Sequence, residues 1–185
     1  MRRPAGRSPG RDNERKGVTV SQITTPRELF LHELGDIMYV ENALANEVLP
    51  KLISEVTDEE FRKALEQHLE QTKGHLKNVE QVFEELGETP QPEECIGFEG
   101  LKSEHDKLLE ETSPDLVDSV DLGAAARTEN YEIAAYEGLR RMAKAMGEDS
   151  AVELLDKNLA EEKEALRMVE KISTRVANES AKAYA

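Results

Sequence analysis

The 185-residue sequence has no tryptophan, a single cysteine and few aromatic residues, which make up 4% of the chain. Because Cys95 stands alone, no disulfide can form within the chain, and a reducing compartment is the simpler setting. No apolar run approaches the roughly 20 residues of a membrane-spanning helix. The start of the chain also lacks the apolar segment of a secretory signal. We therefore expect a cytoplasmic protein that makes no contact with a membrane.

Basic residues are scarce outside the start of the chain. The formal net charge is −15 at pH 7, although the first 22 residues hold six basic and only two acidic side chains. The remaining chain is therefore even more acidic than the total indicates, and it should repel the phosphates of a nucleic acid. Residues 1–23, which combine basic side chains with glycine and proline, are expected to form a disordered tail.

The residues that are abundant, Ala, Leu, Glu and Lys, lose little side-chain freedom in a helix, so we expect an all-α protein. Thr25, Pro26 and Glu28 form a helix start signal, and Pro50 should bend or break the first helix near its end. The predicted helices cover about residues 26–53, 58–86, 99–111, 115–146 and 149–173 or beyond. The tail over residues 179–185 is expected to fray.

One stretch of the chain, residues 88–98, carries two prolines and a glycine and is predicted to be a loop. With the short helix that follows, the stretch 88–114 is long enough to carry the chain across a bundle, as the long connection of ferritin-like folds does. We therefore predict one domain over residues 24–178: a ferritin-like four-helix bundle with a long crossover and a short extra helix between helices 2 and 3. From the pattern alone, a plain up-and-down bundle is the alternative.

Polar residues interrupt the apolar stripe of every long helix. Positions spaced alternately by three and four residues share one helix face, and on that face apolar residues lie on both sides of each interruption. The interrupting side chains are Glu41 on the first helix, His68, Thr72 and His75 on the second, Glu129 and Glu132 on the third, and Glu162 on the fourth. The bundle interior should therefore contain a cluster of carboxylates and imidazoles.

Carboxylates brought together in this way cannot neutralise one another, and a buried carboxylate without a partner costs several kcal/mol. Two divalent cations would balance them, and this mixture of oxygen and imidazole ligands suits iron or manganese and, less specifically, zinc. His68 is the better histidine candidate, because His75 lies two turns away and both rarely reach one ion. Glu161 is a weaker candidate beside Glu162, and Tyr136 could bond a ligand carboxylate.

Each of these residues also has an ordinary structural explanation when it is taken alone. Glu41 could lie at the edge of the bundle, and either histidine could be a hydrogen-bonded core residue. Glu162 could be a surface residue paired with Lys163 or Arg167. No inward partner is evident for His32 or His105, so we assign them no role.

Five segments of the sequence resemble the YciE/YciF family of ferritin-like proteins. They are LGDIMYVENAL (34–44), HLEQTKGH (68–75), GFEGL (97–101), ENYEIAAY (129–136) and LAEEK (159–163), and the resemblance covers about residues 25–172. It implies a bacterial stress-associated protein with a rubrerythrin-like bundle, a di-iron centre and a tendency to form homodimers.

The residues that match charged positions of this family are Glu41, His68, Glu129, Glu132 and the Glu161/Glu162 pair. Three positions depart from the family pattern: Gln71 replaces a frequent Glu, Asn130 replaces a frequent His, and Ala165 stands three residues after Glu162, where a histidine is absent. Gln71 can bond a ligand but is a poor one itself, so this departure should lower metal affinity.

Three functions are consistent with these features. The first is a di-iron or di-manganese protein that oxidises Fe(II) or reduces oxygen or peroxide at a carboxylate-bridged site in the bundle core. The second is a metal-free, dimeric helical stress protein whose site has degenerated. The third is a small module that binds or delivers iron through its acidic surface. Of these three functions, the first would make the protein an oxidoreductase.

Overall fold

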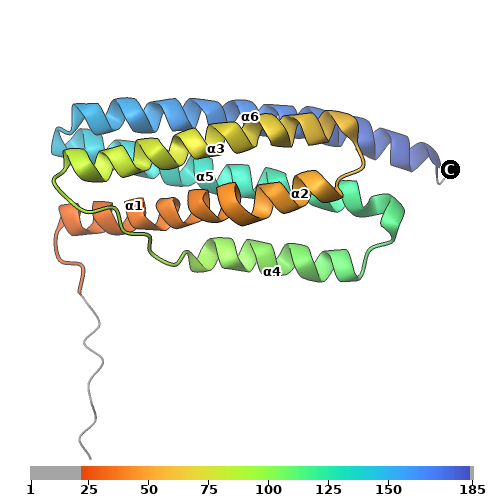
Figure 1. Ribbon diagram of the computed structural model, residues 1–185, viewed down its shortest axis with the longest axis horizontal. Coiled ribbons are helices and arrows are strands. Elements are labelled where there is room, and N and C mark those ends of the chain that lie inside the picture. The colour runs from red at the N-terminus through yellow and green to blue at the C-terminus, as the bar shows by residue number, and fades with distance from the viewer. Residues whose placement is uncertain (1–21, 184–185) are drawn as a thin grey trace, which may run out of the picture.

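The computed structural model describes residues 22–183, and helices account for most of them (Figure 1). The elements are α1 (Pro26–Ala43), a π-helical turn η1 (Leu44–Val48), α2 (Leu49–Glu55), α3 (Glu59–Glu85), α4 (Ile96–Glu110), a 3₁₀ turn η2 (Pro114–Leu116), α5 (Val117–Met146) and α6 (Asp149–Ala183). Helix α1 contacts α3 and α5, and α6 contacts the same two helices. These contacts close a ring, so the expected four-helix bundle is confirmed.

The connection between α3 and α5 crosses the whole length of the bundle. Both helices run from right to left in Figure 1, so the chain must return between them. Helix α4 lies along this return path and packs against α5. The predicted long crossover with a short extra helix is therefore confirmed, and the up-and-down alternative is wrong.

Local sequence signals determine several helix ends. The Thr25 hydroxyl accepts a hydrogen bond from the Glu28 amide (3.1 Å), and Glu28 accepts one from the Thr25 amide (2.9 Å), which completes the expected capping box. Helices α3 and α5 end before Gly87 and Gly147, whose φ angles of 74° and 80° favour glycine.

The first long helix is continuous but contains the π-helical turn η1 shortly before Pro50. The Leu49 amide bonds to the Leu44 carbonyl, five residues back, instead of four. Pro50 has no amide hydrogen and its ring clashes with a carbonyl one turn earlier, so a wider turn ahead of it accommodates the proline. The expected disruption thus takes the form of a π turn between α1 and α2, not a break.

One predicted helix boundary is wrong. Helix α4 begins at Ile96 instead of about residue 99, because the buried Cys95 caps it by accepting a hydrogen bond from the Phe98 amide. Helix α6 continues through residues 179–183, which we expected to fray. An ion pair between Arg175 and Glu179, one turn apart, supports this end. The predicted tail over residues 1–23 lies almost entirely outside the described residues, as do residues 184–185.

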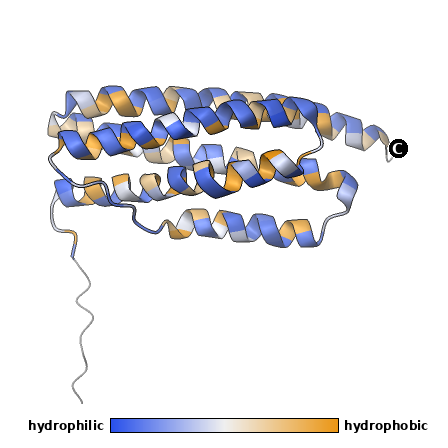
Figure 2. Ribbon diagram, viewed as in Figure 1, coloured by the Kyte–Doolittle hydropathy of each residue, from blue (hydrophilic) through white to orange (hydrophobic). Residues whose placement is uncertain are grey.

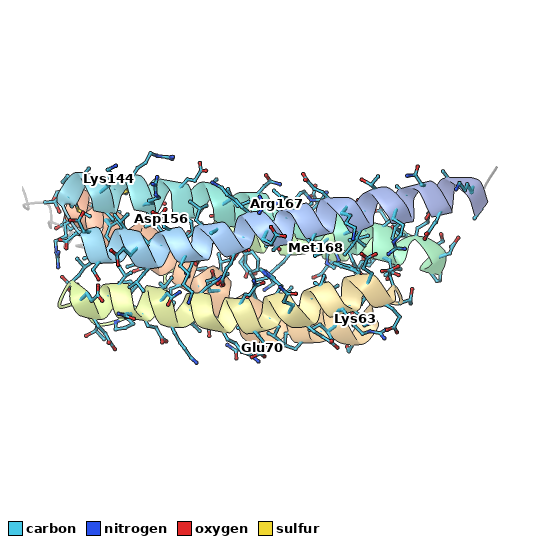
Figure 3. All side chains as sticks on the ribbon, turned by 90° about the horizontal axis from the view of Figure 1, so that it is seen from above. Lys63, Glu70, Lys144, Asp156, Arg167 and Met168 are labelled. Atoms are coloured by element: carbon cyan, nitrogen blue, oxygen red, sulfur yellow. The ribbon has the colours of Figure 1, made fainter. Side chains whose placement is uncertain are left out.

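Apolar residues of all four long helices meet inside the bundle, and hydrophilic residues alternate with them along each ribbon (Figure 2). On the outside, the labelled side chains of Glu70, Lys144 and Arg167 point away from the bundle (Figure 3). Among residues 22–183, no helix combines the length and the apolar character needed to cross a membrane.

Candidate metal centre

A cluster of buried polar residues lies in the interior of the bundle, and every long helix contributes to it. Its members are Glu41 from α1, His68 and His75 from α3, Glu129 and Glu132 from α5, and Glu162 from α6, none more than 6% exposed. Each is flanked along its helix by buried apolar residues. The helical periodicity of the sequence therefore identified the inward positions correctly.

The ligand atoms of this cluster form two groups that share one residue. His68, Glu129, Glu132 and Glu162 form the first group, and Glu41, His75 and Glu162 form the second. Within each group the ligand atoms lie within 4.8 Å of one another. Each group could hold one metal ion, with Glu162 between the two positions.

The two histidines lie two turns apart on α3, and both side chains enter the cluster. His68 Nε2 lies 3.4 Å from Glu129 Oε1, and His75 Nδ1 lies 2.8 Å from Glu162 Oε1 and 3.4 Å from Glu41 Oε1. The ring centroids are 6.4 Å apart. This geometry agrees with the expectation that the two histidines do not bind the same ion. His75 was ranked as the weaker candidate because a second ligand group, to which it belongs, was not considered.

Most carboxylate oxygens of the cluster have no hydrogen-bond donor within the described part of the chain. Both oxygens of Glu132 and of Glu162 and one oxygen each of Glu41 and Glu129 are buried and unpartnered. His75 Nδ1 also has no hydrogen-bond partner, although it lies 2.8 Å from Glu162 Oε1. Buried polar atoms are normally satisfied, so these orphaned atoms fit a site whose missing partners are cations.

Burial and mutual repulsion hold protons on several of these carboxylates. Burial raises the pKa of Glu41 to about 7. Burial, with the charge of Glu162 added, raises the pKa of both Glu129 and Glu132 well above 4.5. Burial would also raise the pKa of Glu162, but contacts with the two histidines outweigh it and lower that pKa. Without metal, Glu162 is therefore the carboxylate of the cluster that ionises most readily.

The pKa values of the two histidines shift in opposite directions. Burial lowers the pKa of His68. Burial acts on His75 too, but the carboxylates of Glu162 and Glu41 outweigh it and raise the pKa of His75 to about 11. In the metal-free protein a proton on His75 and the charge on Glu162 therefore form an ion pair. A metal ion would have to displace that proton.

Glu161 lies behind His75 and does not face the cluster. Its Oε2 is 2.9 Å from His75 Nε2, the ring nitrogen that points away from Glu41 and Glu162. Such a carboxylate keeps the proton on the outer nitrogen and leaves the lone pair of the inner one free for a metal. Glu161 is thus placed to orient His75, which differs from the role of ligand that the sequence suggested.

Tyr136 and Asn158 form hydrogen bonds that hold Glu41 and the backbone of His75 in place. The Tyr136 hydroxyl donates a short hydrogen bond to Glu41, as expected. Asn158 Nδ2 donates to the Tyr136 hydroxyl (3.0 Å) and to the His75 carbonyl (3.2 Å). Asn158 was not predicted from the sequence, although it lies on the buried stripe of α6, three residues after Leu155 and four before Glu162.

Two further residues were left outside the main ligand set by the sequence. Gln71, one turn after His68, is half-buried, and its side chain interacts with that of His68, which agrees with the prediction that it can bond a ligand. His105 was given no inward partner, but its Nε2 lies 2.7 Å from Oδ1 of Asp121, which is 1% exposed. Only the packing of α4 on α5 brings this pair together, so no periodicity within one helix could show it.

Comparisons with known proteins agree with this fold. Residues 25–182 match a family described as a domain of unknown function, DUF892. The chain is also 34% identical over 143 residues to Protein YciF of Escherichia coli K12, which covers 76% of this chain and 86% of YciF.

Three solved structures resemble the bundle. The E. coli stress protein YciF superposes with a TM-score of 0.78 at 30% identity, covering 84% of this chain and 99% of YciF. YcfI from Rhodopseudomonas palustris, for which a structural role has been suggested, gives 0.78 at 34% identity, covering 81% and 96%. A protein from Xanthomonas campestris, at 21% identity and a TM-score of 0.70 over 86% and 99%, shares the fold. The chain belongs to the DUF892 family, and its resemblance to the YciE/YciF proteins is confirmed.

Proposed function

We propose that this protein binds two divalent transition-metal ions in the bundle core and takes part in the oxidation of Fe(II) or the reduction of oxygen or peroxide. The observation that carries the proposal is the set of buried, unpartnered carboxylate oxygens contributed by all four long helices. Iron is the first candidate because carboxylates with one imidazole per position suit it, while manganese and zinc are alternatives. Bound iron would supply the one-electron chemistry.

Charge balance supports two ions. Glu41, Glu129, Glu132 and Glu162 carry four negative charges when all are ionised, and two divalent cations neutralise them. The protons that the pKa values place on Glu41, Glu129 and Glu132 provide a partial balance in the metal-free state. Metal binding should therefore release protons.

The surrounding residues would orient these ligands. Glu161 fixes the tautomer of His75, and Tyr136 holds one oxygen of Glu41 while leaving the other free. Asn158 ties Tyr136 to the backbone of His75, so that α1, α3, α5 and α6 are connected beside the second group. Buried apolar residues flank the cluster on both sides along the helices.

Metal content decides this proposal. Protein purified after growth in iron-rich and manganese-rich media is analysed for metals, and metal-free protein is titrated with Fe(II) under anaerobic conditions before oxygen is admitted. We expect uptake of two ions and an iron oxidation that is faster than in buffer. The double variant Glu129→Gln/Glu132→Gln should lose both, while Glu66→Gln, an exposed residue of α3, should lose neither. Absence of any metal uptake would overturn the proposal.

The metal-free alternative has one observation in its favour, the ion pair that His75 and Glu162 can form without a metal. Because YciF is described as a stress protein, we propose a role in stress for this chain under either function. A homodimer is proposed as well, and light scattering on the metal-free and the metal-loaded protein tests it.

A further inference from the structure

A cavity of about 260 Å³ lies beside the cluster, between η1, α2 and α3 on one side and α4 and α5 on the other. Its walls are mostly apolar. Leu44, Val48, Leu49, Leu52, Leu65, Phe98 and Leu101 supply the larger side chains, and Ala124 and Ala125 supply the small ones.

Two local features keep this cavity open. The π turn η1 adds a residue to the first long helix after Glu41, which changes the direction of the side chains that follow, and Leu44 and Val48 of this turn line the wall. Opposite them, α5 presents Ala124 and Ala125 where larger side chains would fill the space. Thr128, one turn later, also lines the cavity.

The inner end of the cavity reaches the proposed metal centre. His68 and Glu129 line the cavity and also belong to the first ligand group. A molecule in the cavity would therefore contact the first metal position directly. At the outer end the lining residues are charged and of both signs: Glu47, Lys51, Glu55, Lys102 and Asp106.

The charges favour an uncharged occupant. A cation or an anion would lose its hydration among leucine side chains. The inner end presents one imidazole and one carboxyl group, His68 and Glu129, which can form hydrogen bonds with an uncharged polar group. A cavity of roughly 150 Å³ with apolar walls accommodates benzene, so a cavity of 260 Å³ has room for a larger molecule.

We propose that this cavity binds a small uncharged organic molecule of about ten non-hydrogen atoms, with an apolar body between α2 and α4 and a polar end directed at His68 and Glu129. The orientation of the polar end toward a metal rests on the proposed function, whereas binding of the apolar body does not.

The test uses 1-octanol as the probe, with octanoate and octylamine as its charged counterparts, and measures affinity for the metal-free protein by ligand-observed NMR. Ala125→Leu fills the cavity, and Ala134→Leu adds the same atoms to an exposed position of the same helix. We expect wild type and Ala134→Leu to bind 1-octanol equally, and Ala125→Leu to bind it at least about tenfold more weakly. The charged counterparts should also bind at least about tenfold more weakly.

Leu52→Gln changes a half-buried residue in the opposite wall and should also weaken the binding of 1-octanol. This variant replaces Ala125→Leu in the test if Ala125→Leu does not fold.

In protein loaded with paramagnetic Co(II), the CH₂ group beside the hydroxyl of 1-octanol should relax faster than its terminal methyl group. The proposal is overturned if no variant differs from wild type, if an ion binds better than 1-octanol, or if the methyl group relaxes faster. Metal content is measured on the same samples. Metal uptake without probe binding overturns the cavity alone, and probe binding without metal uptake overturns the metal centre alone.

Discussion

Two groups of acidic residues in this bundle show opposite electrostatics. Where the start of α3 meets the end of α6, Asp58 contacts Arg175 at 2.7 and 2.8 Å, and Glu60 contacts Lys171 at 2.8 Å and Arg175 at 3.2 Å. Burial alone would raise the pKa of Asp58, but Arg175 outweighs it and lowers that pKa. In the central cluster, by contrast, burial raises the pKa of Glu41, Glu129 and Glu132.

The pKa values of the two groups shift in opposite directions because the side chains beside the carboxylates differ. The group at the bundle end is complete as a protein structure, because each carboxylate has a basic side chain beside it. The central cluster has no lysine or arginine among its described contacts, and its histidines cannot serve four carboxylates. Mutation of equivalent residues in the two groups should therefore have different consequences.

The largest expected effect is the loss of metal in Glu162→Gln, because both ligand groups share this residue. Removing an outer-shell partner already costs about 10–100-fold in metal affinity, so loss of the shared ligand should cost at least about 100-fold. Glu60→Gln, in the group at the bundle end, should leave affinity unchanged. Competition with a chelator measures both, and equal affinities would contradict the distinction between the two groups.

The second effect is a dependence of metal affinity on pH. Protons compete with the metal for Glu41, whose pKa is about 7, and for Glu129, Glu132 and His75, whose pKa values are also raised. Each proton that the metal displaces should make affinity rise about tenfold per pH unit. Titrations at pH 6, 7 and 8 check this slope, and an affinity independent of pH would show that the cluster carboxylates are not the ligands.

A smaller effect with a distinctive sign is expected for Glu132→Gln in the metal-free protein. The pKa of Glu132 is higher in the folded than in the unfolded state, so wild type loses stability as pH rises above the unfolded value of 4.5. Glutamine has no such penalty, so the variant should be more stable than wild type at pH 8 and similar to it at pH 4. Urea unfolding of chelator-treated protein tests this, and with metal bound the sign should reverse.

The smallest effect is expected for Arg175→Ala. Its partly exposed ion pairs with Asp58 and Glu60 should contribute about 1 kcal/mol or less to the free energy of unfolding. Because the folded-state pKa of Asp58 is lowered, this contribution should be present above an unfolded pKa near 3.8 and be lost as pH falls through the folded value. Urea unfolding from pH 2 to 7 measures it, and a gain in stability at pH 7 would contradict it.

Much of the fold was predictable because it depends on short-range patterns. Thr25 with Glu28, and the glycines at 87 and 147, determine helix ends locally. The π turn η1 was not predictable in this form, because a proline in a helix can be accommodated by a break, a kink or a wider turn. The continuation of α6 to Ala183 was missed because polar composition alone does not distinguish an exposed helix from a frayed end.

The cluster itself could be predicted as far as single helices determine it. Glu41, His68, Glu129, Glu132 and Glu162 occupy apolar positions of a helical repeat, and the structure brings them together. The division into two ligand groups depends on which carboxylates of the other helices lie beside His68 and which lie beside His75. The roles of Glu161 behind His75 and of Asp121 beside His105 depend on contacts between helices, which no pattern within one helix contains.

The order of the helices along the chain also determines when the cluster can be assembled. As the chain is synthesised from its N-terminus, Glu41, His68 and His75 are made early, and Glu162 on α6 is made last. Contacts between residues so distant in sequence form slowly in folding. A nascent chain therefore holds an incomplete set of the cluster residues, and under the proposed function a metal ion would stabilise the fully assembled bundle over partly folded forms.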